Sequence, residues 1–390
     1  MVSFFRFMES EFTYVDSPDG VSALTAFLEP HEVVALDTEA DNLHHYATRV
    51  CLLQIAAGGE IYLIDPLAGL DLSGLFRVLE PKLLIMHGSD FDLRLLWEHS
   101  RFKPREVFDT MLAAQLLGRS RIGLSSLLDE ILGIHHPKDS QKSDWSKRPL
   151  SKKMLDYAAR DVKHLHRLHE AMAAELERLG RSEWHRQRCQ LQIEVAAGGF
   201  PDADPFAWRI GPSRDWPPRA VAALYELWHW RDAEARRLDR PPFKVMTNDY
   251  LKALCLAVAE GNWRDAYEAL PRGLKRGRAR GLLQALERGA KRDPASLPKR
   301  EKRSVRPAPL NARELSRQDA LKDHRDREAE KLGIDPTLIA TRAQIAQIAR
   351  EPDAAAEVLL PWQVGLLEPV LAGKLFRNGR NTEPSSSAPR

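Results

Sequence analysis

Cysteine and long apolar runs are both scarce in this 390-residue sequence. Its three cysteines, Cys51, Cys189 and Cys255, lie far apart and lack the paired spacing of a zinc site or a disulfide framework. This pattern favours a reducing compartment, and we expect the cytoplasm. No run of about 18 apolar residues occurs, and the N-terminus has no apolar stretch after a basic start. We therefore expect neither a membrane span nor a secretion signal.

An excess of one charge is also missing. The 58 Lys and Arg residues against 55 Asp and Glu give a formal net charge of +3, which does not by itself indicate a partner. The distribution is uneven, however. Residues 291–309 carry seven basic residues, two acids and four prolines, which predicts a basic, semi-stiff linker. The polar, serine-containing residues 377–390 are predicted to be a disordered tail.

The first 180 or so residues have the pattern of an α/β domain. Short apolar runs predict strands over residues 33–39, 50–56, 61–65, 83–86 and 107–109. Gly58 and Gly59 separate the second and third of these runs, which predicts a hairpin. The last two runs each precede a segment with helical spacing, and this alternation is typical of an α/β fold. At roughly 100–200 residues per domain, the chain has room for two or three domains.

Beyond about residue 180 the strand signals end, and helical segments alternate with proline-rich breaks. The segment 230–238 (WRDAEARRL) resembles 324–332 (HRDREAEKL). The same offset of 94 residues aligns 245–247 with 339–341. We interpret these segments as two copies of one small helical domain.

Two acidic side chains end the first predicted strand. Asp37 and Glu39 are separated by one residue, so they share one face of the strand and repel each other if unpaired. An acidic turn at a strand end is the ordinary explanation, since Asp41 and Asn42 follow. The alternative is a divalent cation site, because a hard cation takes oxygen ligands and removes the repulsion. That alternative requires further ligands downstream.

Later segments offer such candidates. Asp92 follows His-Gly-Ser and falls in the first turn of a predicted helix, where capping or the helix dipole also explains an acid. Tyr157 and Asp161 are four residues apart on a predicted helix, which places them on one face about 5–6 Å apart at Cβ. A phenol and a carboxylate can then converge on one point, although a packed tyrosine and a paired surface acid would have the same spacing.

These motifs in their order resemble the DEDD exonucleases of the tyrosine subclass, and within them the ribonuclease D family. The matching stretches are Asp-Thr-Glu at 37–39, His-Gly-Ser-Asp-Phe-Asp at 87–92, Ser-Asp-Trp-Ser-Lys-Arg-Pro-Leu at 143–150 and Tyr-Ala-Ala-Arg-Asp at 157–161. The two C-terminal repeats are similar to the HRDC module, a small helical domain that binds nucleic acid.

The resemblance implies a domain organisation. We expect a ribonuclease H-like exonuclease domain over residues 1–200, with a mixed sheet flanked by helices, and two small all-α HRDC-like domains. The predicted ranges after the first domain are 211–290 for the first HRDC-like domain, 291–309 for the linker, 310–376 for the second HRDC-like domain and 377–390 for the tail.

The same resemblance implies a 3′-to-5′ exoribonuclease that trims RNA, above all the 3′ ends of tRNA precursors, and releases nucleoside 5′-monophosphates. It would use two divalent ions, Mg²⁺ or Mn²⁺, because clustered acids need cations and two metals suit phosphodiester hydrolysis. Nothing in the sequence indicates an obligate assembly, so we expect a monomer. By resemblance Asp37 would bridge both ions, and Glu39, Asp92 and Asp161 would be the other ligands. Tyr157 would orient the attacking water, since an ordinary tyrosine stays protonated at neutral pH.

A second group of residues is a candidate for RNA contact. Lys142, Lys147 and Arg148 flank Trp145, and this mixture is typical either of a solvated loop or of a surface that binds single strands by phosphate contact and stacking.

Two other functions stay open at this stage. One is a 3′-5′ DNA exonuclease, since the same carboxylates serve proofreading domains, and the other is a non-catalytic RNA-binding scaffold. Among the remaining polar residues, His44 and His45 are interpreted as loop residues, and Asp109 as the cap of the helix that follows it.

Overall fold

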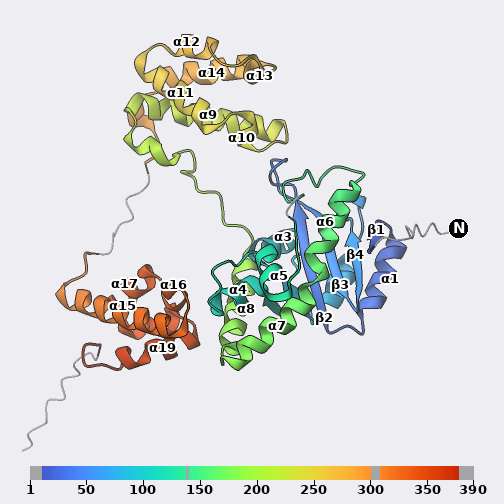
Figure 1. The fold of residues 1–390 in the computed structure, drawn as a ribbon. Coiled ribbons are helices and arrows are strands. Elements are labelled where there is room, and N and C mark those ends of the chain that lie inside the picture. Colours follow the sequence, from blue (N-terminus) through green and yellow to red (C-terminus); the bar gives the residue numbers. More distant parts are fainter. Residues whose placement is uncertain (1–10, 138–139, 300–307, 377–390) are drawn as a thin grey trace, which may run out of the picture.

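The structure is a computed structural model that describes residues 11–137, 140–299 and 308–376. The predicted tail at 377–390 and part of the predicted linker, residues 300–307, lie outside this range. An α/β region is followed by two separate groups of helices (Figure 1).

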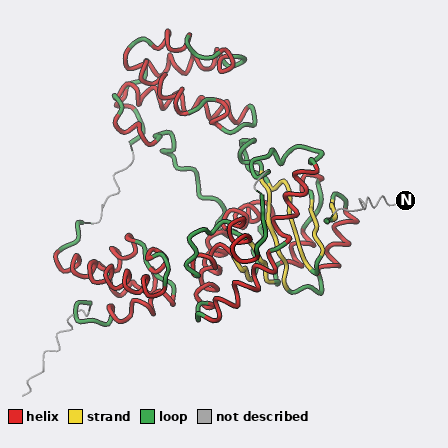
Figure 2. The backbone as a smooth tube through the Cα atoms, in the orientation of Figure 1, coloured by secondary structure: helices red, strands yellow, loops and turns green. Residues whose placement is uncertain are grey.

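Six strands form one mixed sheet within the described part of the chain (Figure 2), in the order β1-β4-β3-β2-β5-β6. They are β1 (Thr13–Val15), β2 (Val33–Ala40), β3 (Val50–Ala57), β4 (Glu60–Ile64), β5 (Leu83–Met86) and β6 (Glu106–Asp109). Strand β3 is antiparallel to both β2 and β4, and the other neighbours pair in parallel. The predicted hairpin is confirmed: Gly58 and Gly59 have φ values of 57° and 87°, which a two-residue turn of this kind requires.

Helices cover both faces of this sheet, as predicted (Figure 1). They are α1 (Pro18–Leu28), α2 (Ser73–Leu79), α3 (Asp90–Ser100), α4 (Thr110–Leu116), α5 (Leu124–Leu132), α6 (Lys152–Lys163), α7 (Leu165–Arg178) and α8 (Ser182–Ala196). Ala35 of β2 packs in the core beneath α6 and α7, whereas Val34 and Leu36 pack in the core beneath α1 and α2. Because side chains alternate along a strand, Asp37 and Glu39 follow Ala35 onto the face covered by α6.

The C-terminal half of the described chain is helical. The first group contains α9 (Pro218–Arg237), α10 (Pro242–Val245), α11 (Asn248–Glu260), α12 (Trp263–Glu268), α13 (Arg272–Lys275) and α14 (Ala279–Lys291). The second contains α15 (Ala312–Leu332), α16 (Pro336–Ile339), α17 (Arg342–Arg350), α18 (Ala355–Val358) and α19 (Pro361–Leu371). Among the helices that the structure describes, none combines the length and apolar character needed to cross a membrane.

Each helical group contains the same internal contact at the positions of the sequence repeat. Arg231 of α9 is buried and donates from Nη1 to the carbonyl oxygen of Met246, 3.1 Å away. Arg325 of α15, 94 residues later, is also buried and donates to the carbonyl oxygen of Ala340 at 2.9 Å. In each group a buried arginine therefore joins the long helix to the turn that follows the next short helix.

The start of the predicted linker belongs instead to the first helical group. Lys291 ends α14, Arg292 forms an ion pair with Glu226 of α9, and Leu297 is buried in the core of this group. The linker prediction is therefore wrong for residues 291–297. The basic, proline-rich composition does not indicate the two contacts that hold this segment against α9. They are the buried Leu297 side chain and the ion pair of Arg292 with Glu226.

Candidate active site

The acidic end of β2 extends beyond its neighbour β5. The two strands pair only over Val33–Ala35 of β2, so from Leu36 onward β2 is paired only with β3. The unpaired edge opens a space beyond the end of β5. Asp37 and Glu39 lie beside this space, and both are half-buried.

Asp92 reaches the same space from the first turn of α3. The loop that leads to it turns at Gly88, where φ is +69° and a Cβ would contact Met111. Asp109 holds this loop in place. Its buried carboxylate caps α4 and accepts hydrogen bonds from the backbone N–H groups of Gly88 at 3.0 Å and Ser89 at 2.8 Å. The prediction that Asp109 is a helix cap is confirmed.

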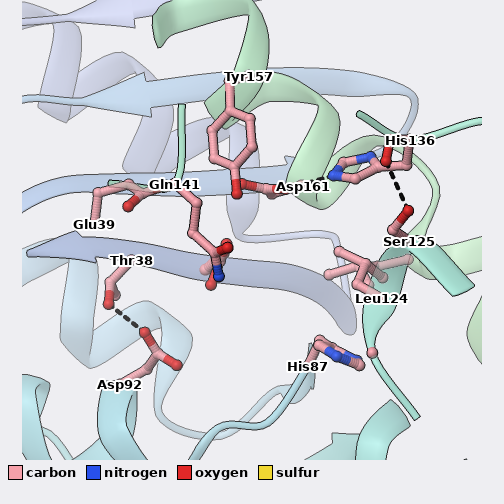
Figure 3. Close-up of a pocket in the computed structure, with 13 residues that line it drawn as sticks. Thr38, Glu39, His87, Asp92, Leu124, Ser125, His136, Gln141, Tyr157 and Asp161 are labelled. Carbon is pink, nitrogen blue, oxygen red and sulfur yellow. Dashed lines mark hydrogen bonds and ion pairs between the residues drawn. The ribbon is translucent and has the colours of Figure 1, made fainter. Parts of the chain in front are cut away.

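Helix α6 supplies Tyr157 and Asp161. It begins after Ser151, whose hydroxyl accepts from the Met154 amide, and it packs against β2, β3 and β4. Each of the two residues is 6% exposed, and their side chains lie on one face of the helix, as their spacing predicts. The Tyr157 hydroxyl points down to the Asp161 carboxylate in Figure 3, and the two are hydrogen-bonded.

One pocket of about 280 Å³ is lined by all five predicted site residues (Figure 3). They come from β2, α3 and α6, which are far apart in the sequence. The structure thus brings together Asp37, Glu39, Asp92, Tyr157 and Asp161.

Burial raises the pKa values of all four pocket acids, and at Asp37 and Glu39 the neighbouring acids raise them further. Burial, followed by the charges of Asp92 and Asp161, holds the pKa of Asp37 well above its ordinary value. The pKa of Glu39 is likewise raised well above its ordinary value, first by burial and then by Asp37. Burial raises the pKa of Asp92 to about 7, although the hydrogen bond from Thr38 opposes the shift. Burial also raises the pKa of Asp161, against hydrogen bonds from His136 and Tyr157.

A divalent cation fits this donor set. Four carboxylates supply only oxygen ligands, which hard cations prefer, and their mutual repulsion is the kind that a bound cation removes. As the side chains lie, no three His, Cys, Asp or Glu residues of the described chain converge tightly enough to surround an ion. Asp92, for example, is turned toward the Thr38 hydroxyl, with which it forms a short hydrogen bond.

Two members of the predicted RNA-contact group, Trp145 and Arg148, make contacts within the domain. Trp145 is only 1% exposed and lies against Tyr157, with ring centroids 6.2 Å apart, so it cannot stack on a base. Arg148 pairs with Asp65 at 2.5 Å and donates to the carbonyl oxygen of Cys51 in β3. It therefore joins the loop before α6 to the sheet. Lys142 and Lys147 are not buried, and their role stays a prediction.

Sequence reasoning missed several pocket residues, namely Thr38, His87, Gln141 and His136. Thr38 and His87 lie inside the matched motifs without a predicted role, whereas Gln141 and His136 are single polar residues in a loop without a spacing that would mark them. His44 and His45 lie in the loop between β2 and β3, as interpreted from the sequence, and they do not line the pocket.

Comparison with known proteins gives the family. The family described as "3'-5' exonuclease" matches residues 12–177, and the HRDC domain family matches residues 221–260. Ribonuclease D of Pseudomonas paraeruginosa is 31% identical over 78% of this chain and 81% of its own length. The chain belongs to the ribonuclease D family. Ribonuclease D of Nitrobacter hamburgensis is similar over a longer span, with 28% identity over 88% of this chain and 90% of the relative.

A solved structure shows the same fold. Escherichia coli RNase D superposes with a TM-score of 0.65, covering 93% of this chain and 99% of that one at 24% identity. The exonuclease match and the ribonuclease D relatives together make this chain a 3′-5′ exoribonuclease. The predicted fold class, a mixed-sheet exonuclease domain followed by helical HRDC-type sequence, is confirmed.

Proposed function

We propose that this ribonuclease D-family enzyme removes nucleotides from RNA 3′ ends at the pocket between β2, α3 and α6, with Asp37, Glu39, Asp92 and Asp161 as ligands of two divalent ions. The supporting observation is that four acids and one tyrosine from separate segments line one pocket. Mg²⁺ and Mn²⁺ both suit an oxygen-only ligand set.

Bound divalent ions would supply charge neutralisation at the phosphate and activation of water. The chain's own residues hold the carboxylates and the attacking water in position. Asp37 and Glu39 are fixed on one strand face, and Asp161 is fixed by α6 beside them. Burial, followed by the charges of Asp161 and Glu39, raises the pKa of Tyr157, so its hydroxyl keeps its proton at neutral pH. Tyr157 can then orient a water by hydrogen bonding, and the products would be nucleoside 5′-monophosphates.

The natural substrates that we propose are structured RNAs, above all tRNA precursors with 3′ extensions. The similar E. coli RNase D is an exoribonuclease involved in structured RNA processing. The HRDC match at residues 221–260 supports a nucleic-acid-binding role for the first helical group. Lys142 and Lys147 would contact RNA near the pocket.

We further propose three domains: an exonuclease domain at residues 1–200, a first HRDC-like domain at 211–297 and a second at 310–376. The matching buried-arginine contacts support the second repeat. One chain supplies every proposed catalytic group, which supports a monomer. Three buried, unpaired cysteines support a reducing cytoplasm.

Matched RNA and DNA oligonucleotides labelled at the 5′ end test the proposal. With Mg²⁺ or Mn²⁺ we expect a ladder of shortened RNA that a chelator abolishes, and slower cleavage of DNA. Faster cleavage of DNA would indicate a DNA exonuclease. Binding of RNA without a ladder in either metal would indicate a scaffold.

A further inference from the structure

A buried histidine contacts one of the proposed metal ligands. His136 lies after α5 and is 4% exposed. Its Nε2 is 2.9 Å from Oδ1 of Asp161, a contact drawn as a dashed line in Figure 3. The Ser125 hydroxyl donates to the His136 carbonyl oxygen at 2.7 Å, so α5 fixes the backbone of this loop.

The direction of this hydrogen bond follows from the chemistry. An ionised carboxylate only accepts hydrogen bonds, so the imidazole Nε2–H is the donor. Tyr157 also hydrogen-bonds the same carboxylate. Asp161 is therefore held from two sides, by a phenol on its own helix and by a ring from the loop after α5. Two directional bonds restrict its rotamers more than burial alone.

An ordinary structural role is the competing explanation, because buried histidines generally find a hydrogen-bond partner. Two other histidines of this domain illustrate that role. His166 contacts the carbonyl oxygen of Ala56 at 2.9 Å, and His185 contacts that of Asp109 at 3.0 Å. Both satisfy backbone groups. His136 differs because its partner is a carboxylate that lines the pocket.

We propose that His136 is a positioning residue: its Nε2–H orients the Asp161 carboxylate toward the pocket, which strengthens divalent cation binding there. The inference rests on the proposed function of Asp161 as a ligand. Groups that hydrogen-bond a metal ligand commonly change metal affinity or activity by about 10–100-fold when they are removed.

Two substitutions separate the hydrogen bond from packing. His136→Leu removes the N–H donor and fills the same space with an apolar side chain. His136→Gln carries an amide N–H that can reach the place of Nε2. His166→Leu is the matched control, because it removes a partly buried histidine that lies outside the pocket. Far-ultraviolet circular dichroism and thermal melts check that each variant folds.

Mn²⁺ binding to the full-length protein without RNA, followed by electron paramagnetic resonance, is the main readout. We expect His136→Leu to raise the Mn²⁺ Kd about 10–100-fold. His136→Gln and His166→Leu should stay within about 3-fold of the wild type. In single-turnover cleavage, His136→Leu should require more Mn²⁺ for half of its maximal rate, and its KM for RNA should not change.

Asp161→Asn separates failure of this inference from failure of the proposed function. If Asp161→Asn binds Mn²⁺ and cleaves RNA like the wild type, the proposed ligand role itself is wrong. If Asp161→Asn is defective but His136→Leu binds Mn²⁺ normally, only the positioning role is overturned. The positioning role is also overturned if His136→Gln folds normally and binds Mn²⁺ as weakly as His136→Leu. The shape of the side chain, rather than its hydrogen bond, would then determine Mn²⁺ binding.

Discussion

The five proposed catalytic residues are of two chemical kinds. Asp37, Glu39, Asp92 and Asp161 are carboxylates whose pKa values are raised chiefly by burial, and at Asp37 and Glu39 also by the charges of the other acids. Tyr157 is a phenol whose raised pKa keeps it protonated, so it has no charge to offer a cation at neutral pH. Substitutions should therefore affect the two kinds differently.

Tyr157→Phe should slow the chemical step far more than it weakens metal binding, because Asp161 keeps its hydrogen bond from His136. The ring and its packing remain, and only the hydroxyl that orients water is lost. We expect the single-turnover rate to fall about 10²–10⁴-fold, as for other positioned acid–base groups. Added Mn²⁺ should not restore it. By contrast, Asp161→Asn removes a ligand charge, so high Mn²⁺ should restore part of its rate.

Rates measured across a Mn²⁺ titration distinguish these outcomes. If Tyr157→Phe cleaves at the wild-type rate, Tyr157 is only a packing residue and the tyrosine has no role in water positioning.

Asp109→Asn should destabilise the fold in a pH-dependent manner. Burial alone would raise the pKa of Asp109, but hydrogen bonds from the Ser89 and Gly88 amides hold it below the ordinary value. Its contribution is therefore complete above the unfolded pKa of about 3.9 and is lost as pH falls through the lower folded pKa. We expect a loss of about 1–3 kcal/mol at pH 7, measured by urea unfolding, and a smaller difference near pH 3.

Asp71→Asn is the matched control for Asp109→Asn. Asp71 accepts a hydrogen bond from the Ser73 amide in the same way, but it is exposed. Asp71→Asn should lower the free energy of unfolding much less than Asp109→Asn does. Equal losses at pH 7 and pH 3 for Asp109→Asn would contradict the linkage to a depressed pKa.

At the scale of single elements, local spacing predicted much of the site. The apolar runs marked β2 through β6 because buried strands need continuous apolar side chains. The strand period of two placed Asp37 and Glu39 on one face. The helix period placed Tyr157 above Asp161. These relations lie within one element, so they are visible without knowing how elements pack.

Relations between elements could not be predicted in this way. Strand β1 has only three residues and is defined by its pairing with β4. Trp145 has the flanking charges of an exposed residue but packs against α6. His136 matters only because the loop after α5 meets α6. Each depends on contacts between segments that no local spacing encodes.

The buried arginine of each helical group provides a prediction for these elements. Arg231→Met leaves the Met246 carbonyl and the Asn248 side chain without this donor. Arg325→Met does the same to the Ala340 carbonyl. We expect each to lower the free energy of unfolding of its own group by about 1–3 kcal/mol, measured by urea denaturation.

Arg237→Met is the control for these two variants. Arg237 lies on the same helix as Arg231, but its side chain is 60% exposed and pairs with Glu234, three residues earlier on that helix. Its effect should stay below about 0.5 kcal/mol. If the two buried-arginine variants also stay below this level, the repeated contact does not stabilise the helical groups.

At the scale of the whole molecule, both helical groups contact the exonuclease domain. Asp239 after α9 accepts from His45 at 2.7 Å, in the loop that follows β2. In the second group, Trp362 stacks on Trp184 of α8, with centroids 4.8 Å apart. Arg181 donates to the carbonyl oxygen of Leu332 at 2.7 Å. The α/β region that carries the pocket is thus in contact with both helical groups.

Gly118→Ala should loosen the second helical group. A Cβ at Gly118 would clash with the carbonyl oxygen of Gly333, so the two segments would have to separate. We expect a larger radius of gyration in small-angle X-ray scattering and faster limited proteolysis. Gly133→Ala is the control, since its φ of +66° resembles the +72° of Gly118 but no atom lies within 4 Å of its Cβ.

Both glycine variants share the backbone strain of about 1–2 kcal/mol that a left-handed alanine carries. Only Gly118→Ala adds the clash. An unchanged radius of gyration in Gly118→Ala, or an equal change in both variants, would contradict the described packing of the second group.

The central claim, that the carboxylates of β2, α3 and α6 form a metal-dependent site for RNA cleavage, is tested most directly by Asp37→Asn. Single-turnover cleavage of a 5′-labelled RNA and binding of the same RNA are measured side by side in Mg²⁺. We expect cleavage to be abolished and binding to stay within a few-fold of the wild type, because affinity rests mainly on basic surfaces. Appreciable metal-dependent cleavage by Asp37→Asn would contradict the account.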